Sequence, residues 1–238
     1  MKGVCRLART DDRPGIRPSR AIKRNYLHDT AALQLREMIA KGDIKPGDWL
    51  NEGELALNFG ISRTPMREAI KMLAAEEMLE IVPNHGPRVK LIEKSELKDM
   101  LEIIAVLEAT AGEQACALIT DAEIEELQAV HDDMIRSWDT ENHEGYFSRN
   151  RRIHNEIVRI SGNITLQRLY HSLSGRIQVA RYSSNKTIEQ WRKAVGEHEG
   201  MLRLLRERDG NALFDLMREH VRSQNEVITA AYGAGSAS

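Results

Sequence analysis

The spacing of hydrophobic and polar positions changes at about residue 92 and separates two kinds of structure. Before this point, apolar residues recur every three or four positions from 27 to 39, which predicts an amphipathic helix that Gly42 ends. The same spacing predicts a short second helix from 52 to 58. A third helix is expected to start at Thr64, whose hydroxyl can cap free amide groups, with Pro65 at the first helical position.

Past Leu79 the spacing of apolar residues falls to two, which is typical of β-strands. Two short strands at 81–83 and 88–91 flank the turn sequence Asn84-His85-Gly86-Pro87 and so form a predicted hairpin. Two helices, a tight turn, a third helix and a hairpin within residues 28–92 predict a winged helix-turn-helix domain.

From residue 93 to residue 234 only helical spacing occurs. Ser95 is expected to cap a long helix that runs to Ile119. Thr120 with Glu123, and Thr187 with Gln190, have the spacing of capping boxes for two later helices. Further helices are predicted at about 143–161, 164–181 and 211–231. We therefore predict a mainly α protein, in which the winged domain precedes an all-α bundle of six or seven helices, with a short tail at 235–238.

Composition excludes several classes of protein. The chain has 238 residues, 41% hydrophobic and 29% charged, which is incompatible with disorder throughout. It contains no uncharged apolar run long enough to span a membrane and no secretory signal, so we expect no membrane partner and a cytoplasmic location. The two cysteines, Cys5 and Cys116, are too few and too far apart for a disulfide framework or a thiolate zinc site.

Charge is distributed unevenly between the two parts. Residues 1–92 hold 16 basic and 12 acidic side chains, whereas residues 93–238 hold 18 basic and 24 acidic ones. A basic first part favours contact with a polyanion there alone. Residues 1–27, with eight basic residues and no apolar periodicity, are expected to form a flexible arm.

The segment SRTPMREAI at 62–70 opens the third helix of the winged domain and carries the strongest functional signal. A helix that presents its N-terminal end to a major groove needs donors for phosphates and for guanine O6 and N7. Ser62, Arg63, Thr64 and Arg67 supply such donors. At the hairpin tip, His85 is a further donor, and Gly86 lets the backbone approach a phosphate or a minor groove.

The run ELALNFGISRTPMREAIKMLAAEEML, followed by a short wing, resembles the N-terminal domain of GntR-type bacterial transcription regulators. The resemblance implies that double-stranded operator DNA is a partner and that Ser62, Arg63, Thr64, Arg67, His85 and Gly86 contact it. One departure stands at Gly53, because many relatives carry an arginine just before the acidic residue that opens the second helix. A contact to DNA is expected to be missing there.

Histidines in the second part form another candidate site. Asn150 and His154 are four residues apart and share one helix face, while His198 and His220 lie on two later helices. Three imidazoles and one oxygen donor inside a helical bundle could hold a divalent metal ion, although chance clustering and ordinary packing remain alternatives on spacing alone. Because these ligands are neutral, an anion is expected to complete the coordination of such an ion.

The segments NRRIHNEIVRISGN and GEHEGMLRLLRERDGNALFDLMREHV resemble the FCD-type ligand-binding domain of the FadR-like branch of that family. The resemblance implies a divalent metal, most simply Zn²⁺ with Ni²⁺ or another ion as alternatives, beneath a cavity for a small organic acid effector. The family's aspartate is replaced by Asn150, which predicts weaker metal binding or an empty site. The family's frequent arginine is replaced by Ile104, so Arg176 or Arg181 is the expected substitute that anchors the acid.

These features together predict a ligand-responsive repressor that binds DNA as a homodimer and is not an enzyme. The alternative class is a metal-dependent hydrolase built on the histidines, with the first domain as a targeting module. Such an enzyme needs a general base at the metal, and Glu197 beside His198 is expected to point away from the metal face. A purely architectural DNA-bending protein would not need the second domain.

Overall fold

The computed structural model describes residues 27–182 and 187–234, so the predicted arm, apart from Leu27, and the tail at 235–238 lie outside the described residues. The first part of the chain contains three helices and a hairpin. They are α1 (Leu27–Lys41), α2 (Glu52–Asn58), α3 (Arg63–Ala75), β1 (Leu79–Val82) and β2 (Gly86–Val89).

The third helix begins two residues earlier than expected. Ser62, with an extended backbone, holds the capping position, and its side chain makes no capping hydrogen bond. The prediction that Thr64 caps this helix was therefore wrong, and Pro65 is the third helical residue instead of the first. Proline is tolerated there because the first N–H groups of a helix have no partner within it. Met66, Ala69, Ile70 and Leu73 face the core.

The wing is an antiparallel hairpin in which Leu79 pairs with Val89 and Val82 pairs with Gly86. Both strands start two residues before the predicted positions because buried Leu79 and Val89 tie the hairpin to the domain core. An isolated bridge joins Trp49, which lies outside the hairpin, to Arg88, and local spacing did not indicate this pairing. Gly86 has a φ of +95° at the tip, a conformation that favours glycine.

The second part contains six helices within the described residues, which settles the predicted number at six. They are α4 (Lys94–Leu118), α5 (Asp121–Asp139), α6 (His143–Ile160), α7 (Ile164–Tyr182), α8 (Ile188–Glu207) and α9 (Gly210–Ala234). Ser95 does not cap α4, because the helix begins at Lys94 and Glu93 occupies the capping position without a side-chain bond. The mainly α fold, with a winged helix-turn-helix before an all-α bundle, is confirmed.

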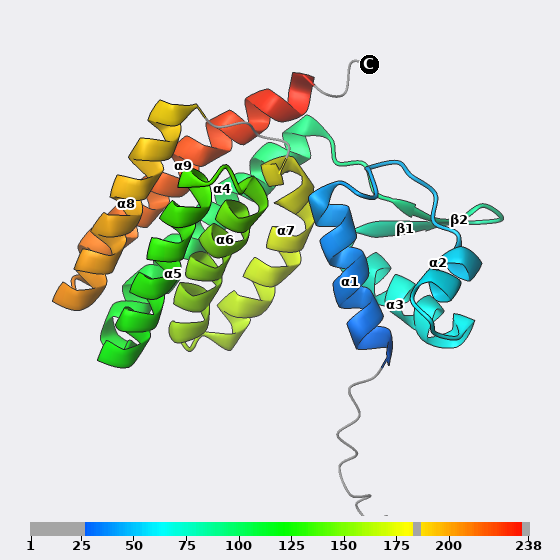
Figure 1. Ribbon diagram of the computed structural model, residues 1–238, viewed down its shortest axis with the longest axis horizontal. Coiled ribbons are helices and arrows are strands. Elements are labelled where there is room, and N and C mark those ends of the chain that lie inside the picture. The colour runs from blue at the N-terminus through cyan, green and yellow to red at the C-terminus, as the bar shows by residue number, and fades with distance from the viewer. Residues whose placement is uncertain (1–26, 183–186, 235–238) are drawn as a thin grey trace, which may run out of the picture.

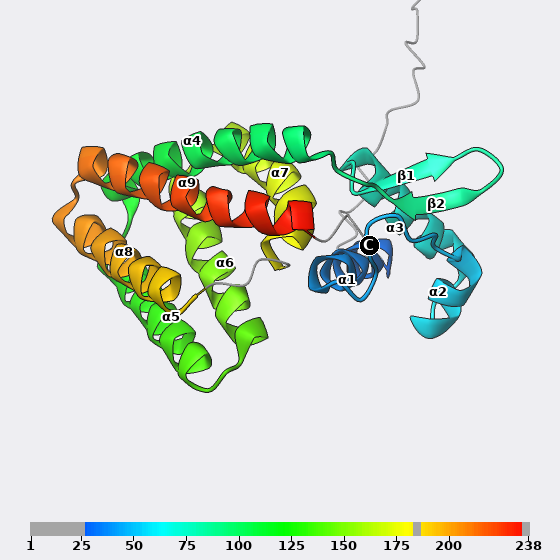
Figure 2. The ribbon, with the colours of Figure 1, turned by 90° about the horizontal axis from the view of Figure 1, so that it is seen from above.

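The two longest helices, α4 and α9, lie side by side through the bundle (Figures 1 and 2). Gly112 of α4 makes this approach possible, because a Cβ atom there would collide with the Met217 sulfur and crowd Leu213. Both of these α9 side chains are fully buried. None of the described helices is long and apolar enough to cross a membrane.

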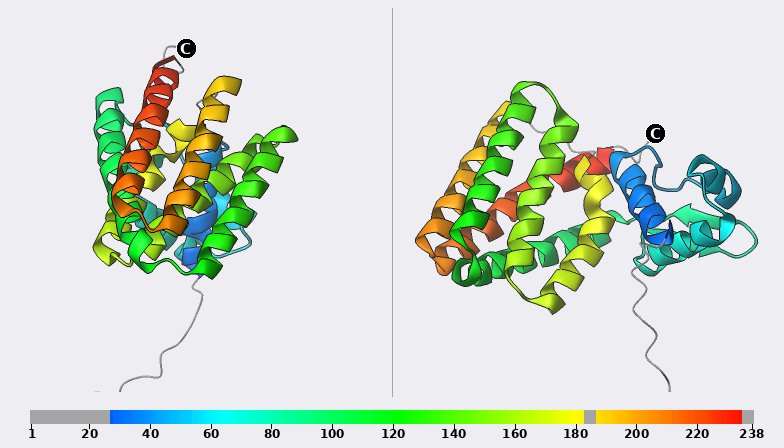
Figure 3. Two further views of the ribbon diagram at one scale, coloured as in Figure 1. Left: turned by 90° about the vertical axis from the view of Figure 1, so that its left-hand side faces the viewer. Right: turned by 60° about the horizontal axis from the view of Figure 1, so that its bottom comes forward.

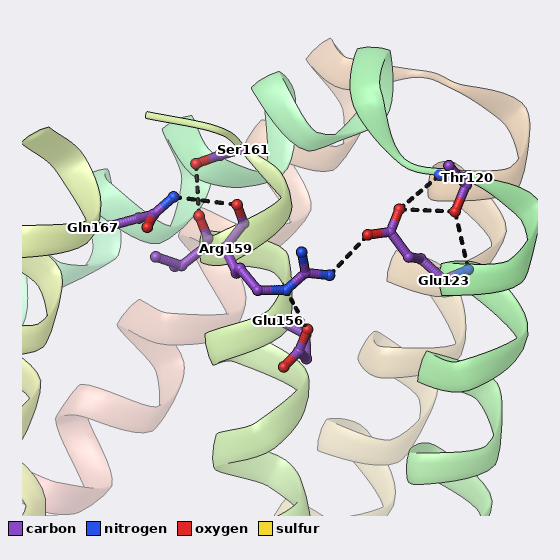
Figure 4. A network of polar contacts seen from close by, with 7 residues as sticks. Thr120, Glu123, Glu156, Arg159, Ser161 and Gln167 are labelled. Atoms are coloured by element: carbon purple, nitrogen blue, oxygen red, sulfur yellow. Dashed lines mark hydrogen bonds and ion pairs between the residues drawn. The ribbon is translucent and has the colours of Figure 1, made fainter. Parts of the chain in front are cut away.

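A polar network fastens the start of α5 to the end of α6 (Figure 4). Thr120 and Glu123 form the predicted capping box, and Thr187 and Gln190 form the second one at α8. Glu123 also accepts a 2.8 Å hydrogen bond from Arg159, whose Nε donates to Glu156. The Arg159 hydrogen bond, followed by the Thr120 bonds, lowers the pKa of Glu123 to about 2.

The winged domain sits at one end of the bundle, with α1 against α7 (Figures 1 and 3). Arg176 of α7 joins the two parts through ion pairs with Glu77, just after α3, and with Glu96 of α4. Beside Arg176, a small cavity of about 20 Å³ lies between side chains such as Ile39, Met78 and Ala180.

The Glu123 network predicts a pH-dependent contribution to stability. Because the folded-state pKa is depressed, the contribution is full above the ordinary pKa of 4.5 and is lost as the pH falls toward about 2. Glu123→Gln should therefore lower the melting temperature at about pH 7, and the difference from wild type should shrink as the pH is lowered through about 4. Thermal unfolding followed by circular dichroism checks this, with exposed Glu126→Gln as control. A difference that is constant with pH would contradict it.

Candidate functional site

The start of α3 presents the predicted DNA-contacting side chains to solvent. Ser62, Arg63, Thr64 and Arg67 are all exposed. Their helix is held by its buried inner face, while its N-terminal end projects from the domain. The free N–H groups and partial positive charge of a helix N-terminus add to the attraction of the two arginines for phosphate.

Two neighbours on α2 influence these arginines. Arg67 is 58% exposed and its Nε donates a 3.0 Å hydrogen bond to Glu52, so this guanidinium is held in place before any partner binds. Arg63 lies against Gly53, where an added Cβ would stand 3.4 Å from its Nη2 atom.

At the wing tip, His85 is exposed and its Nδ1 lies 3.1 Å from the Pro83 carbonyl oxygen. Trp49 lies behind the tip, with its ring 5.7 Å from the His85 ring and 5.1 Å from the Arg88 guanidinium carbon. Arg88 also pairs with Glu80 across the hairpin. These contacts tie the tip to Trp49, just before α2. Trp49 escaped the sequence analysis because its neighbours come from a distant strand.

The three predicted histidines meet inside the bundle. His154, His198 and His220 come from α6, α8 and α9, are each at most 4% exposed, and offer ligand nitrogens within 4.8 Å of one another. The His198 and His220 ring centroids are 4.8 Å apart, and the His154 and His220 rings are stacked at 5.3 Å.

Two carboxylates lie against these imidazoles, and the sequence analysis missed both roles. Oε2 of Glu108 is 2.6 Å from Nδ1 of His154, and Oε2 of Glu197 is 2.6 Å from Nδ1 of His220. The expectation that Glu197 points away from the cluster was therefore wrong. Burial alone would raise the pKa of Glu197, but the His220 hydrogen bond and Lys193 outweigh it, so the pKa is lowered and the ionised carboxylate can accept a hydrogen bond from Nδ1 of His220.

Glu108 could have been found in the sequence. It lies one helical turn after Ile104 on the inward stripe of α4, and both side chains are fully buried. An acid at such a position must have a buried partner, because an unpaired charge in a protein interior is very costly. For Glu197 no comparable signal exists, since its neighbours on α8 do not indicate which helix it meets.

Further polar groups surround the cluster. The Asn150 Oδ1 atom, one turn before His154 on α6, is buried without a hydrogen-bond partner among the described residues. His131 of α5 is 1% exposed and its ring centroid is 6.1 Å from that of His198. Burial lowers the pKa of His131, so its imidazole is neutral at pH 7. This fourth histidine was not among the predicted ligands.

Of the two predicted effector anchors, only the side chain of Arg176 is described, and it does not lie at this cluster. Arg176 lies at the junction with the winged domain, 10% exposed, and is already paired with Glu77 and Glu96. An acid bound by Arg176 would have to displace one of these carboxylates. The side chain of Arg181 lies outside the described part of the chain. An effector role for either arginine stays a prediction.

The donor set fits a divalent metal ion. Two nitrogens bound to one ion at about 2.1 Å are at most about 4.2 Å apart, so the three imidazoles need only a small closure. The carboxylates beside the Nδ1 atoms of His154 and His220 favour protons there and leave each Nε2 lone pair for a metal, the usual arrangement around metal-bound histidines. The buried triad could therefore hold a metal ion.

Family comparisons cover both parts of the chain. The model for bacterial regulatory proteins of the gntR family matches residues 27–89, and the FCD domain model matches residues 99–223.

Three known proteins are similar to most of the chain. The Nta operon transcriptional regulator of Aminobacter aminovorans is 31% identical over 194 residues, which cover 79% of this chain and 89% of the relative. The transcriptional repressor RspR of Escherichia coli K12 is 25% identical over 195 residues, covering 82% and 85%. The structure of McbR/YncC from Escherichia coli superimposes with a TM-score of 0.79 at 22% identity, covering 87% and 98% of the two chains.

Proposed function

The chain belongs to the GntR family of bacterial transcriptional regulators, in the group with an FCD C-terminal domain, and we propose that it is a repressor whose DNA binding is controlled by a small organic acid at a metal-containing pocket. It is a regulator and not an enzyme, so the hydrolase alternative is discarded. The observation that carries the proposal is the pairing of an exposed basic helix start with a buried histidine cluster in one chain. Since bacterial regulators bind the chromosome, we place its action in the cytoplasm.

In the proposed complex, the N-terminal end of α3 lies in a major groove. Arg67 reads a base edge, Arg63, Ser62 and Thr64 contact phosphates or neighbouring bases, and His85 with Gly86 approaches the adjacent backbone or minor groove. The ion pair with Glu52 supports this role for Arg67 because a guanidinium already held in one direction loses less freedom when it binds.

Arg67→Ala should weaken binding to an operator selected from a random library by roughly 1–3 kcal/mol, with little change on random DNA, because base-edge contacts discriminate sequences. Titrations by fluorescence anisotropy at one fixed salt concentration check this. Lys71→Ala, one turn further along α3, serves as the matched control. Equal losses on both DNAs would reassign Arg67 to a phosphate contact.

The metal site is proposed to use His154, His198 and His220, with Asn150 as a weak fourth ligand. The buried, unpartnered oxygen of Asn150 supports this assignment. A bound Zn²⁺, or Ni²⁺ in its place, would supply a Lewis-acidic position for a carboxylate effector. The carboxylates of Glu108 and Glu197 alter the expected charge balance, because they offset the ion's charge and weaken its attraction for an acid.

Titration calorimetry with Zn²⁺ on chelator-stripped protein tests the ligands. His198→Ala should abolish high-affinity binding, Asn150→Asp should tighten it because a carboxylate adds charge, and Glu108→Gln should weaken it about 10–100-fold by removing the partner of His154. His143→Ala, at an exposed histidine, should bind like wild type. Zinc binding by His198→Ala that equals wild type would show that the ion sits elsewhere.

The effector is tested on the same samples with a panel of small carboxylic acids that do not chelate zinc strongly. Acid binding should require the metal, and at saturating zinc it should strengthen in Glu108→Gln, where one opposing charge is gone. Acid binding that is independent of metal would move the effector site to Arg176, Arg181 or other groups.

We propose that the protein is a homodimer that associates through the outer face of α4. This helix lies at the edge of the bundle (Figure 2), and Ile103 and Val106 are 53% and 47% exposed on it. Adjacent exposed aliphatic side chains on one helix face favour burial against a partner. A dimer also doubles the DNA site that one winged domain can read.

Val106→Arg should shift the protein from dimer to monomer in sedimentation velocity experiments, because a charge would be buried in the interface. Glu126→Arg, on the exposed face of α5, is the matched control and should stay dimeric. The monomeric variant should bind operator much more weakly. A wild-type protein that sediments as a monomer, or a dimer unaffected by Val106→Arg, would refute this interface.

A further inference from the structure

A cleft between the winged domain and the bundle is large enough for a small molecule. Its volume is about 590 Å³, within the range of ligand pockets in proteins. Helix α1 forms one wall, and α6 and α7 form the other, at the junction where α1 lies against α7 (Figure 1). The cleft lining does not include the three clustered histidines, so it is separate from the proposed metal pocket.

Two cations in this cleft have no protein partner. Arg151 of α6 and Arg168 of α7 form no ion pair or side-chain hydrogen bond with any residue in the described ranges. Several other arginines of this chain pair with carboxylates, as Arg36 does with Glu76 in the same cleft. Two unpaired guanidinium groups in one cleft therefore leave a concentration of positive charge.

Polar side chains of the wall are also unsatisfied. Gln178 is 7% exposed and its Nε2 atom has no hydrogen-bond partner within the described residues. The Asn155 Oδ1 atom is likewise buried and unpartnered there. Buried polar atoms are nearly always satisfied, so these two groups point to a polar ligand. Ser172 and Ser174 add hydroxyl groups to the same lining.

The charges that line the cleft leave a net positive balance. Arg36 and Glu76 neutralise each other in a double hydrogen bond at 2.8 Å. Glu37 is the single acid that then stands against Arg151 and Arg168 among the described lining residues. Burial lowers the pKa of His171, so at pH 7 its imidazole adds no positive charge and offers one N–H donor.

We propose that this cleft binds a small phosphorylated metabolite, with its phosphate held by Arg151 and Arg168 and its polar body by Gln178 and Asn155. Guanidinium groups match the oxygens of a phosphate in paired hydrogen bonds, and amide and hydroxyl groups suit a polyhydroxylated body. This second ligand site goes beyond the proposed function and does not depend on it. A ligand there contacts α1 and both bundle helices, so it would fix the winged domain relative to the bundle.

The test uses the full-length protein with inorganic phosphate as the probe, at constant ionic strength. Binding is followed by ³¹P line broadening and by the rise in melting temperature. Wild type should bind phosphate, and the double variant Arg151→Gln/Arg168→Gln should bind it at least tenfold more weakly. Arg152→Gln changes the exposed neighbour of Arg151, outside the cleft lining, and should bind like wild type.

Glu37→Gln keeps the proposal testable if the double variant fails to fold. Removing the opposing carboxylate should tighten phosphate binding severalfold, because the repulsion between two anions is lost. Phosphate binding that is unchanged in both the double variant and Glu37→Gln would overturn the proposal. Acetate that binds as tightly as phosphate at the same ionic strength would overturn the assignment to a phosphate group.

Two further measurements test whether phosphate binds at the histidine cluster instead, and whether Arg151 and Arg168 contact DNA. His198→Ala should retain phosphate binding, and loss of binding in this variant would place the anion at the histidine cluster instead. The salt dependence of DNA binding should be the same for wild type and the double variant. A slope lower by about two in the double variant would show that Arg151 and Arg168 contact DNA phosphates, which would overturn the proposal.

Discussion

The bundle is organised around a polar cluster that its helices must keep paired. Glu108 comes from α4, His154 from α6, Glu197 and His198 from α8, and His220 from α9. Because a buried charge without a partner is strongly destabilising, each of these helices is restricted to positions that keep its polar group in contact. The close packing of α4 on α9 at Gly112 brings the Glu108 and His220 helices together. Stability and ligand chemistry thus depend on the same contacts.

The position of α6 and α7 links this cluster to the DNA-binding end. One face of α6 carries Asn150 and His154 toward the bundle interior, and the neighbouring face carries Arg151 into the cleft beside α1. Helix α7 supplies Arg176, which bridges the winged domain and α4. A ligand that shifts α6 or α7 by a small amount therefore changes contacts with α1 and Glu77. Coupling of this kind requires that the junction has two arrangements and that the ligand binds one of them more tightly than the other.

Local signals in the sequence were sufficient for most of the fold. The helical spacing, the two capping boxes at Thr120 and Thr187, and the turn around Gly86 act over a few residues, so they can be read in order along the chain. The errors lie where elements begin: Thr64 and Ser95 looked like helix caps, and both strands of the wing start two residues earlier than predicted. Several residues in a first turn can serve as caps, and packing of the following turn decides which one does.

The sequence by itself determined the family, the mainly α architecture and the three histidines His154, His198 and His220, because short motifs and helix periodicity encode them. Only the tertiary structure decided that Glu108 and Glu197 meet those histidines and that Arg176 joins the two parts of the chain. It alone also showed that Arg151 and Arg168 share one cleft. The physical reason is that these contacts join helices far apart in sequence, whose relative rotation is set by the packing of the whole core.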